Sequence, residues 1–518
     1  MAAPALNAAP PGMPSRLQLN VIANLAGRIG SVAVAVVCTP FYLHYLGVEA
    51  YGLIGVYLSL FMLASVLDFG LGTTLNREFA RRSTLPEDGG AARDLLRTLS
   101  LVSGALALTA ALLIAAGSGL IAHHWLRTQD LDAGAIGEAI ALMGIALALQ
   151  WPIGLYSGGL SGLQRQVAIN VVLLAAAMAR GVGAVVVLAT FSPTIEVYFL
   201  WQIAVGILHA VALGILLGRA LPRNTRPARV SRAALRSVGG FAAGVSGITV
   251  LSVLASNLDR LLLSAWLPLD RFGHYTLAGF VASLSTLAVA PLFNALLPRF
   301  SELIARKDEV EVASLYHHAA QTVAVVTLPL ASLVIAFAPE ILLVWTRDPA
   351  IAADAAGPAR ALAFGATCLA LANIPYAIQL GHGWTRLAVR LNAAALLVLP
   401  LALYWGVSTA GAVGAAIGWA AVNAATLVAG MLAMHRRYLR GHGLRWLLRD
   451  TLPSVVLSAA VMACARMLMP ENVQPWLVAG ILGTALAAAL AVCALAAPAT
   501  RGLLARWCSG PRPTRTGD

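Results

Sequence analysis

The chain has 518 residues, of which 59% are hydrophobic and 11% are charged, and its formal net charge is +13 at pH 7. Soluble domains carry about 25% charged residues, so this composition excludes a soluble globular protein, whose surface so few charges could not cover. The basic residues lie between long apolar blocks, which indicates anionic lipid headgroups as their partner and not nucleic acid. Several of these blocks exceed the roughly 20 residues that cross a bilayer. The composition therefore predicts an all-α integral membrane protein.

The first half of the chain is predicted to begin with a disordered cytoplasmic N-terminus, residues 1–18, which is rich in Ala and Pro. Apolar runs between breakers and charges then predict six transmembrane helices, at residues 19–46, 50–74, 96–121, 136–160, 167–191 and 195–218. Together these helices form an N-lobe over residues 19–218. A basic cytoplasmic linker over residues 219–237 follows the lobe.

The second half is predicted to repeat this arrangement in a C-lobe over residues 238–434. Its six helices are expected at residues 238–266, 272–298, 318–340, 358–381, 386–406 and 411–434. The remaining segments are a basic cytoplasmic segment over 435–451, a helix pair over 452–497 (at 452–469 and 475–497) and a cytoplasmic tail over 498–518. The total is about fourteen transmembrane helices, in two six-helix halves and a C-terminal pair.

The distribution of positive charge predicts the orientation. With the N-terminus in the cytoplasm, 27 of the 35 Lys and Arg residues fall in cytoplasmic segments. The outside segments hold only four, which are Arg127, Arg271, Arg347 and Arg360. Cytoplasmic loops of membrane proteins carry an excess of Lys and Arg, and a map wrong by one helix would destroy this asymmetry. Both termini are therefore predicted to be cytoplasmic.

Two short segments are similar across the halves. Residues 45–52 read YLGVEAYG and residues 266–273 read WLPLDRFG, and each precedes a long apolar helix that ends at an arginine, Arg77 or Arg299. The segments are about 221 residues apart, which is a distance of six helices. Since six is even, the halves keep the same orientation, which predicts parallel repeats with a substrate path between them. The alternative is a chance similarity of two helix-connecting turns.

No sequence motif indicates an enzyme. The chain has no HExxH, Walker A, GxSxG or Rossmann pattern. Its five cysteines form no CxxC pair, so buried structural thiols are expected rather than metal or redox chemistry. We therefore expect no catalytic residues, no metal site and no cofactor.

Four motifs carry a family resemblance: LGxxxYG at residues 46–52, LDFGLG at 67–72, NLDRLLLS at 257–264 and FGxY at 272–275. On these motifs the chain resembles the Wzx-type polysaccharide flippases of the MOP (multidrug/oligosaccharidyl-lipid/polysaccharide exporter) superfamily. The arrangement of fourteen helices as six, six and two agrees with that family. Pro268 stands where the family usually has glycine in the second turn.

The resemblance implies a flippase that moves an undecaprenyl-pyrophosphate-linked oligosaccharide across the bacterial inner membrane by alternating access. The product would feed lipopolysaccharide O-antigen, capsule or exopolysaccharide biosynthesis. The implied partners are this glycolipid, membrane lipids, a polysaccharide polymerase and chain-length machinery, with no nucleic acid.

Three alternatives stay open at this point. A small-molecule (drug) exporter of the same superfamily would need a smaller and less cationic cavity. A lipid II flippase would share the substrate's pyrophosphate. A membrane-embedded polysaccharide polymerase would usually carry a long or acidic outer loop, whereas the first outer loop here offers only Glu49.

Four polar residues inside predicted N-lobe helices are candidates for contact with the substrate or its cavity: Asn24, Arg28, Asp68 and Arg180. Charges inside a bilayer cost about 2.5–3.5 kcal/mol on insertion scales, so they tend to line cavities or to pair. Arg28 and Asp68 are expected at similar depth in antiparallel helices, where they pair or face a cavity, and an arginine suits bidentate contact with pyrophosphate. Arg180 lies deepest, and Gly181 and Gly183 beside it permit close helix approach. The alternatives are a structural ion pair or snorkelling for Arg28 and Asp68, an interhelical hydrogen bond for Asn24, and an internal hydrogen bond to a helix carbonyl for Arg180.

Asp259 and Arg260 are candidates for a coupling-ion site in the C-lobe. Adjacent residues on a helix point about 100° apart, so these two side chains are not expected to face each other. Asp259 is the candidate to bind a coupling proton or Na⁺. The alternative is an interfacial pair near the outer headgroups.

Overall fold

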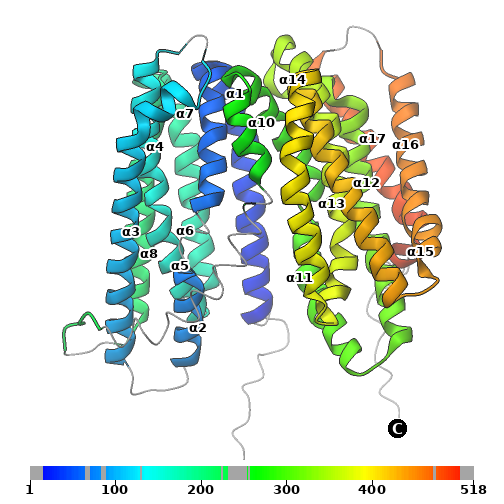
Figure 1. Ribbon diagram of the computed structural model, residues 1–518, viewed down its shortest axis with the longest axis horizontal. Helices are drawn as coiled ribbons and strands as arrows, with labels where there is room; N and C mark the ends of the chain where they lie inside the picture. Colours follow the sequence, from blue (N-terminus) through cyan, green and yellow to red (C-terminus); the bar gives the residue numbers. More distant parts are fainter. Residues whose placement is uncertain are drawn as a thin grey trace, which may run out of the picture. The chain divides into compact units, whose positions relative to one another are not determined.

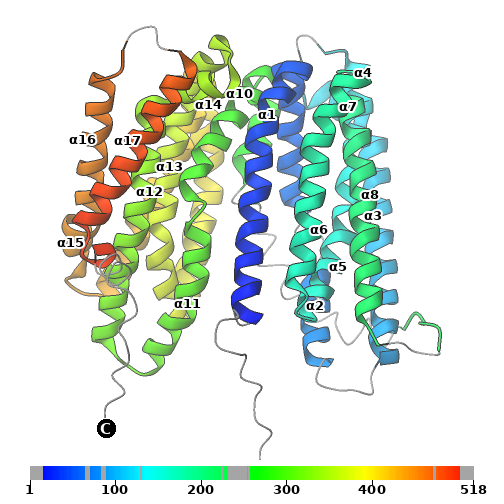
Figure 2. The ribbon, with the colours of Figure 1, turned by 180° about the vertical axis from the view of Figure 1, so that it is seen from behind.

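The computed structural model describes residues 16–64, 70–82, 89–128, 131–222, 226–231, 254, 257–470 and 474–501. Helices account for nearly all of these residues, and no β-sheet forms among them, which confirms the predicted all-α class. The chain divides into two compact units, Met1–Asn257 and Leu258–Asp518. We refer to them as the N-terminal unit and the C-terminal unit (Figures 1 and 2).

The N-terminal unit contains eight α-helices and one π-helix in its described part. They are α1 (Arg16–Ala64), α2 (Leu71–Arg82), α3 (Gly89–His124), α4 (Ala133–Ala148), α5 (Gln150–Gly162), α6 (Gln166–Met178), the π-helix η1 (Ala179–Gly183), α7 (Ala184–Thr190) and α8 (Ile195–Ala220). The helices α6, η1 and α7 follow one another without a gap, so together they form the helix predicted at residues 167–191.

The chain reverses direction within α1. Gly47 has φ 79° and ψ 171°, a conformation that interrupts the helix and that glycine adopts without a steric penalty. The reversal lies inside the predicted turn at residues 45–52, which is thereby confirmed. Figures 1 and 2 show the two parts of α1 running side by side in opposite directions.

The described part of the C-terminal unit begins with helical residues 258–266 and continues through ten further elements. These are α10 (Leu269–Ser283), the 3-10 helix η2 (Leu284–Thr286), α11 (Val289–Ala305), α12 (Glu309–Thr346), α13 (Pro349–Gly381), α14 (Thr385–Arg437), α15 (His442–Arg445), the π-helix η3 (Trp446–Thr451), α16 (Leu452–Met467) and α17 (Pro475–Ala496).

A second reversal makes α14 a helical hairpin. Its 53 residues would extend about 80 Å as one straight helix, more than twice the hydrocarbon thickness. Ala410 and Gly411 have non-helical dihedral angles, with Gly411 at φ 57°. The two halves then meet at glycines: a Cβ atom on Gly406 would lie 2.3 Å from the carbonyl oxygen of Gly414. The predicted boundary between helices 386–406 and 411–434 is confirmed.

Several helices extend beyond the apolar runs that predicted them. α3 begins at Gly89 rather than 96, and α12 begins at Glu309 rather than 318. Residues 442–451, predicted as part of a basic connecting segment, are helical and continue into α16. Hydropathy detects only the part of a helix that matches the hydrocarbon layer, so polar turns that continue the helix beyond it are missed.

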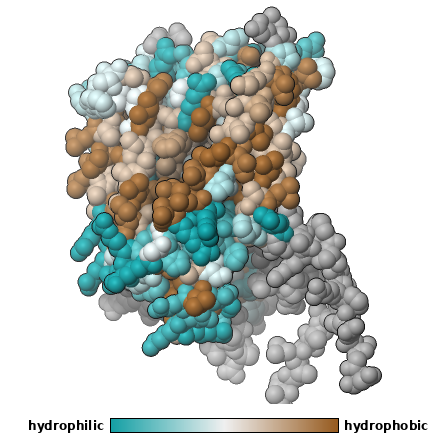
Figure 3. All heavy atoms as spheres, turned by 90° about the vertical axis from the view of Figure 1, so that its right-hand side faces the viewer, coloured by the Kyte–Doolittle hydropathy of each residue, from teal (hydrophilic) through white to brown (hydrophobic). Residues whose placement is uncertain are grey.

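Ten described helices are long and apolar enough to cross a membrane, or eleven if α10 and α11, bent by 40°, form one span. Two of the ten, in α1 and α14, contain the reversals at Gly47 and Gly411. Figure 3 shows an apolar band on one face, with hydrophilic side chains gathered at one end of it. The protein is a multi-pass membrane protein, and fourteen stays the predicted number of crossings.

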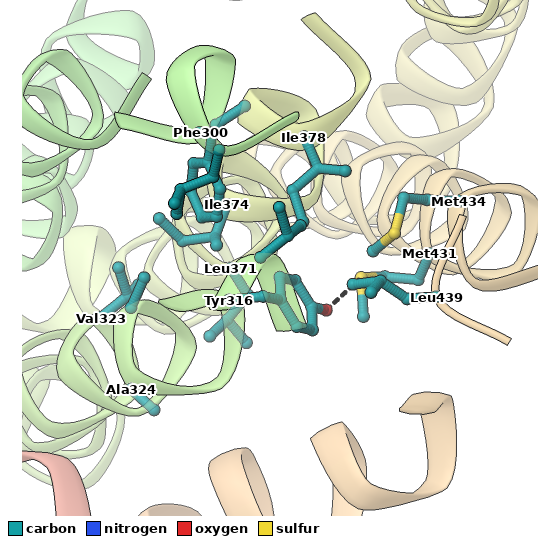
Figure 4. Packing of buried hydrophobic residues seen from close by; sticks show 14 of the residues in the cluster. Phe300, Tyr316, Val323, Ala324, Leu371, Ile374, Ile378, Met431, Met434 and Leu439 are labelled. Atoms are coloured by element: carbon teal, nitrogen blue, oxygen red, sulfur yellow. Dashed lines mark hydrogen bonds between the residues drawn. The ribbon is translucent and has the colours of Figure 1, made fainter. Parts of the chain in front are cut away.

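Each unit has its own buried core. In the N-terminal unit, α2, α3, α5 and α8 meet around Leu75 and Phe79. In the C-terminal unit, α11, α12, α13 and α14 pack around Phe300, Tyr316 and Ile374 (Figure 4). The final helices α16 and α17 pack on α12, through a smaller apolar cluster of their own.

The predicted linker, residues 219–237, lies partly outside the described residues. Residues 226–231 are described and lie against α3 in the N-terminal unit. Asp94 pairs with Arg226 and accepts the backbone N–H of Arg229 at 2.6 Å. The predicted lobe boundaries therefore stay predictions.

Candidate functional site

Arg180 occupies an irregular turn in the middle of an apolar helix. It lies in η1, the π-helix between α6 and α7. Glycines permit close packing on both sides of it: a Cβ atom on Gly181 would lie 2.3 Å from Val34 of α1, and one on Gly183 would lie 2.6 Å from Trp201 of α8. The expected close approach is present, although side chains rather than backbones make it.

Side chains from neighbouring helices hold this π-helix in place. Such a helix leaves carbonyl oxygens out of the regular pattern, and π-turns are frequent at functional sites. The Trp201 indole donates to the carbonyl of Ala179 at 2.8 Å, and the Gln202 amide donates to that of Arg180 at 3.2 Å. The Tyr42 hydroxyl donates to the carbonyl of Gly181 at 3.0 Å. The backbone that carries Arg180 is therefore fixed from both α1 and α8.

The guanidinium of Arg180 has no acidic partner in the described part of the chain. Its Nε is buried and forms no hydrogen bond, and none of the ion pairs of the described residues includes it. The predicted alternative, a hydrogen bond to a helix carbonyl, is not made by this nitrogen. An unpaired cation in an apolar helix is costly, so its presence favours contact with a ligand.

Neutral polar and aromatic groups surround Arg180. Three side chains lie near enough to interact with its charge, namely Tyr57 of α1 and Tyr198 and His209 of α8. Tyr42 and Tyr198 meet edge to face, with ring centroids 5.4 Å apart. The Nδ1 atom of His209 is buried and has no hydrogen-bond partner among the described residues.

The helical period explains how α8 contributes to the site. Tyr198, Gln202, Gly206 and His209 recur at spacings of three and four residues, which places them on one face of the helix. Gly206 lies beside the guanidinium, since a Cβ atom at this position would lie 3.7 Å from Nη2 of Arg180. This spacing is readable in the sequence and could have identified the set. The site thus combines one fixed cation with hydroxyl, amide and imidazole groups.

The other N-lobe candidates lie outside the described side chains. Asn24 and Arg28 fall within α1, but their side chains are not described, and Asp68 lies between α1 and α2 outside the described residues. Nearby, Gly27 of α1 is buried against Asn170 of α6. The proposed pairing of Arg28 with Asp68 stays a prediction.

Asp259 and Arg260 lie in the C-terminal unit and point to different neighbours. Asp259 is 5% exposed and accepts the hydroxyl of Tyr275 on α10 at 3.1 Å. Nη2 of Arg260 lies near Gly279, 3.7 Å from where a Cβ atom would be. An ionised carboxylate offers about four acceptor positions, so the bond from Tyr275 leaves room for a proton or a cation.

Comparisons with known proteins agree with this architecture. A family model described as polysaccharide biosynthesis protein matches residues 17–304, and the MatE family model matches residues 246–405. Among curated proteins, none matches the chain.

Solved structures of transporters share the fold. The lipid II flippase MurJ in an inward closed conformation has a TM-score of 0.68, with 11% identity over 94% of this chain and 99% of that one. An inward-facing multidrug resistance MATE family transporter of the MOP superfamily has a TM-score of 0.62, with 16% identity over 83% of this chain and 96% of that one. At these identities the likeness concerns the fold alone.

Proposed function

Because the chain belongs to the polysaccharide biosynthesis protein family, whose MOP superfamily consists of multi-pass flippases and transporters, we propose that it flips a polyprenyl-pyrophosphate-linked oligosaccharide. In this proposal the protein lies in the bacterial inner membrane with both termini in the cytoplasm. Alternating access of the two halves carries the glycolipid to the outer leaflet, where it enters O-antigen, capsule or exopolysaccharide assembly.

The guanidinium of Arg180, which has no acidic partner among the described residues, is the observation that carries the proposal. Arginine binds phosphate through two parallel N–H donors, and such charge-assisted bonds are about twice as strong as neutral ones. The groups around Arg180 are neutral donors and acceptors, which suit a ligand that combines phosphate with sugar hydroxyls. An exporter of cationic drugs would instead need a carboxylate at this position.

A lipid II flippase is the second candidate. It is favoured by the fold likeness to MurJ, which extends over 94% of this chain. Both substrates carry pyrophosphate on a polyprenyl chain, so the chemistry at Arg180 serves either one. They differ in the sugar, which requires a test on the two lipids in parallel.

We assign the coupling role to Asp259. A flippase without a nucleotide site takes its energy from an ion gradient, the membrane potential or consumption of its product. One elementary charge moved across 100 mV supplies about 2.3 kcal/mol. The buried carboxylate of Asp259 offers a place for a proton or Na⁺ in the C-terminal unit.

The test is deletion of the gene and complementation with the wild-type chain. The measured quantity is the fraction of each lipid exposed on the outer face of the inner membrane, for the lipid-linked oligosaccharide and for lipid II. We expect the oligosaccharide lipid to stay on the inner face in the deletion strain while lipid II is exposed normally. Trapped lipid II would establish the second candidate, and normal exposure of both lipids would overturn the flippase proposal.

A further inference from the structure

A strongly cationic pocket lies in the C-terminal unit, at the turn between α13 and α14. Its volume is about 450 Å³, and it is lined by His382, Gly383, Trp384, Thr385, Arg386, Arg390, Arg437 and Tyr438. We call it the arginine pocket. Three of its eight lining residues are arginines and none is acidic. Within the described chain, none of these arginines forms an ion pair with a carboxylate.

Aromatic rings hold one of the three arginines in place. The Cζ atom of Arg437 lies 4.6 Å from the ring centroid of Trp384 and 5.4 Å from that of Tyr438. His382 stacks on the other aromatic partner, Tyr438, at 3.9 Å between centroids. A guanidinium stacked on its flat face keeps its N–H edge available for an anion. The aromatic contacts thus fix Arg437 in an orientation that suits the binding of an anion.

The other two arginines begin a continuous stripe on α14. Arg386 and Arg390 are four residues apart, so they lie on one face of the helix. The same face continues through Leu397, Leu401 and Tyr404, which are 74%, 72% and 66% exposed. From Arg390 to Tyr404 this stripe extends about 21 Å, enough to cross one leaflet of a bilayer.

We propose that the arginine pocket binds the phosphate headgroup of an anionic phospholipid, whose acyl chain lies along the exposed stripe of α14. Charge complementarity selects the headgroup, because three arginines face the ligand and no lining carboxylate opposes it. The apolar part of the stripe, Leu397, Leu401 and Tyr404, selects a lipid over a free phosphate, since it continues the helix face that carries the arginines. Trp384 and Tyr438 suit a position at the level of the lipid headgroups, because Trp and Tyr side chains concentrate at membrane–water interfaces. The proposal does not depend on which substrate the protein moves.

The test is native mass spectrometry of the full chain in detergent, titrated with phosphatidylglycerol or with phosphatidylcholine of the same acyl chains. The double variant Arg386→Gln/Arg390→Gln is compared with Arg436→Gln/Arg440→Gln. The second pair removes the same charge from the last turn of α14 and the turn that follows it, outside the pocket lining. Thermal unfolding of all proteins in the same detergent establishes that they are folded.

We expect the first variant to bind phosphatidylglycerol about 30-fold more weakly, since each arginine near a charged membrane surface contributes about a factor of five. The second variant should bind within about twofold of wild type, and phosphatidylcholine binding should not change. Equal loss in the two variants, or none in the first, would overturn the proposal.

Two competitors test the assignment of the ligand as a lipid. Inorganic phosphate and deacylated glycerophosphoglycerol are added to the complex of the wild-type chain with phosphatidylglycerol. If the acyl chain occupies the stripe, neither compound displaces the lipid at equal concentration. Displacement by either one would show that the pocket binds a soluble phosphate and would overturn the lipid assignment.

Discussion

The candidate sites of the two units are built on different residues, an arginine in the N-terminal unit and a buried aspartate in the C-terminal unit. In the N-terminal unit, Arg180 lies among tyrosine, glutamine and histidine side chains, and no acid of the described residues pairs with it. In the C-terminal unit, Asp259 is almost fully buried and contacts the Tyr275 hydroxyl. The predicted repeat gives both halves the same succession of helices. The difference teaches that one helical framework can hold a cation suited to an anionic substrate and an acid suited to a coupling ion.

Of all the substitutions, replacement of Arg180 should have the largest effect on flipping. We expect Arg180→Gln to reduce the initial rate of flipping at least tenfold, because a hydrogen bond to a charged group contributes about 1.5–3 kcal/mol. Arg180→Lys should retain an intermediate rate, because it keeps the charge and loses the bidentate geometry. The measurement is the initial rate at which lipid-linked oligosaccharide reaches the outer face, at equal protein level.

The matched control is Arg219→Gln, which removes the same charge from the exposed end of α8. It should flip at the wild-type rate. A normal rate in Arg180→Gln would remove Arg180 from the site.

Replacing Asp259 tests the other side of the comparison. We expect Asp259→Asn to lower gradient-driven accumulation in vesicles about tenfold while leaving flipping without a gradient unchanged. The reason is that a neutral amide cannot exchange a proton or neutralise a bound cation. Asp354→Asn is the control, because Asp354 is exposed and paired with Arg271. Equal gradient dependence in Asp259→Asn and wild type would contradict the coupling role.

Substitutions at two glycines compare how tightly the surroundings of Arg180 and of Arg260 are packed. Gly181→Ala places a methyl group 2.3 Å from Val34, so we expect it to lower the free energy of unfolding by about 1–3 kcal/mol and to reduce flipping. Gly279→Ala, beside Arg260, meets no atom closer than 3.7 Å and should be neutral or stabilise the helix by up to about 1 kcal/mol. Thermal unfolding in detergent measures both. Equal effects would show that close packing is not particular to the Arg180 turn.

The smallest effect on stability is expected from removing the Tyr42 hydroxyl, which donates to the backbone of the π-helix η1. Tyr42→Phe removes the bond to the Gly181 carbonyl and should lower the free energy of unfolding by about 1 kcal/mol. Tyr198→Phe is the control, since no hydrogen bond of its hydroxyl occurs among the described contacts, and it should change stability less. If Tyr198→Phe is the more damaging variant, the support assigned to Tyr42 is wrong.

The membrane-spanning architecture could be predicted because few physical rules decide it. Long apolar blocks have to become helices in a bilayer, since each helix satisfies its own backbone hydrogen bonds. Gly47 lies within a turn predicted from the pattern of residues 45–52, and the chain reverses there. The depth of Arg180 followed from counting residues along one apolar run.

The finer features could not be predicted because they depend on contacts between distant segments. The π-helix at Ala179–Gly183 is held by side chains of α1 and α8 that no local pattern connects to it. Similarly, Asp450 lies in a segment read as basic and cytoplasmic, yet it is buried against His317, 133 residues away. Local composition carries no information on such pairs.

The glycine contact within α14 has a consequence for how the chain enters the membrane. Because Gly406 and Gly414 meet backbone to backbone, no lipid or side chain fits between the two arms near the reversal. Only Ala410 and Gly411 connect the arms, so no hydrophilic loop needs to be translocated. The two arms are therefore suited to leave the insertion machinery together, as one closed hairpin.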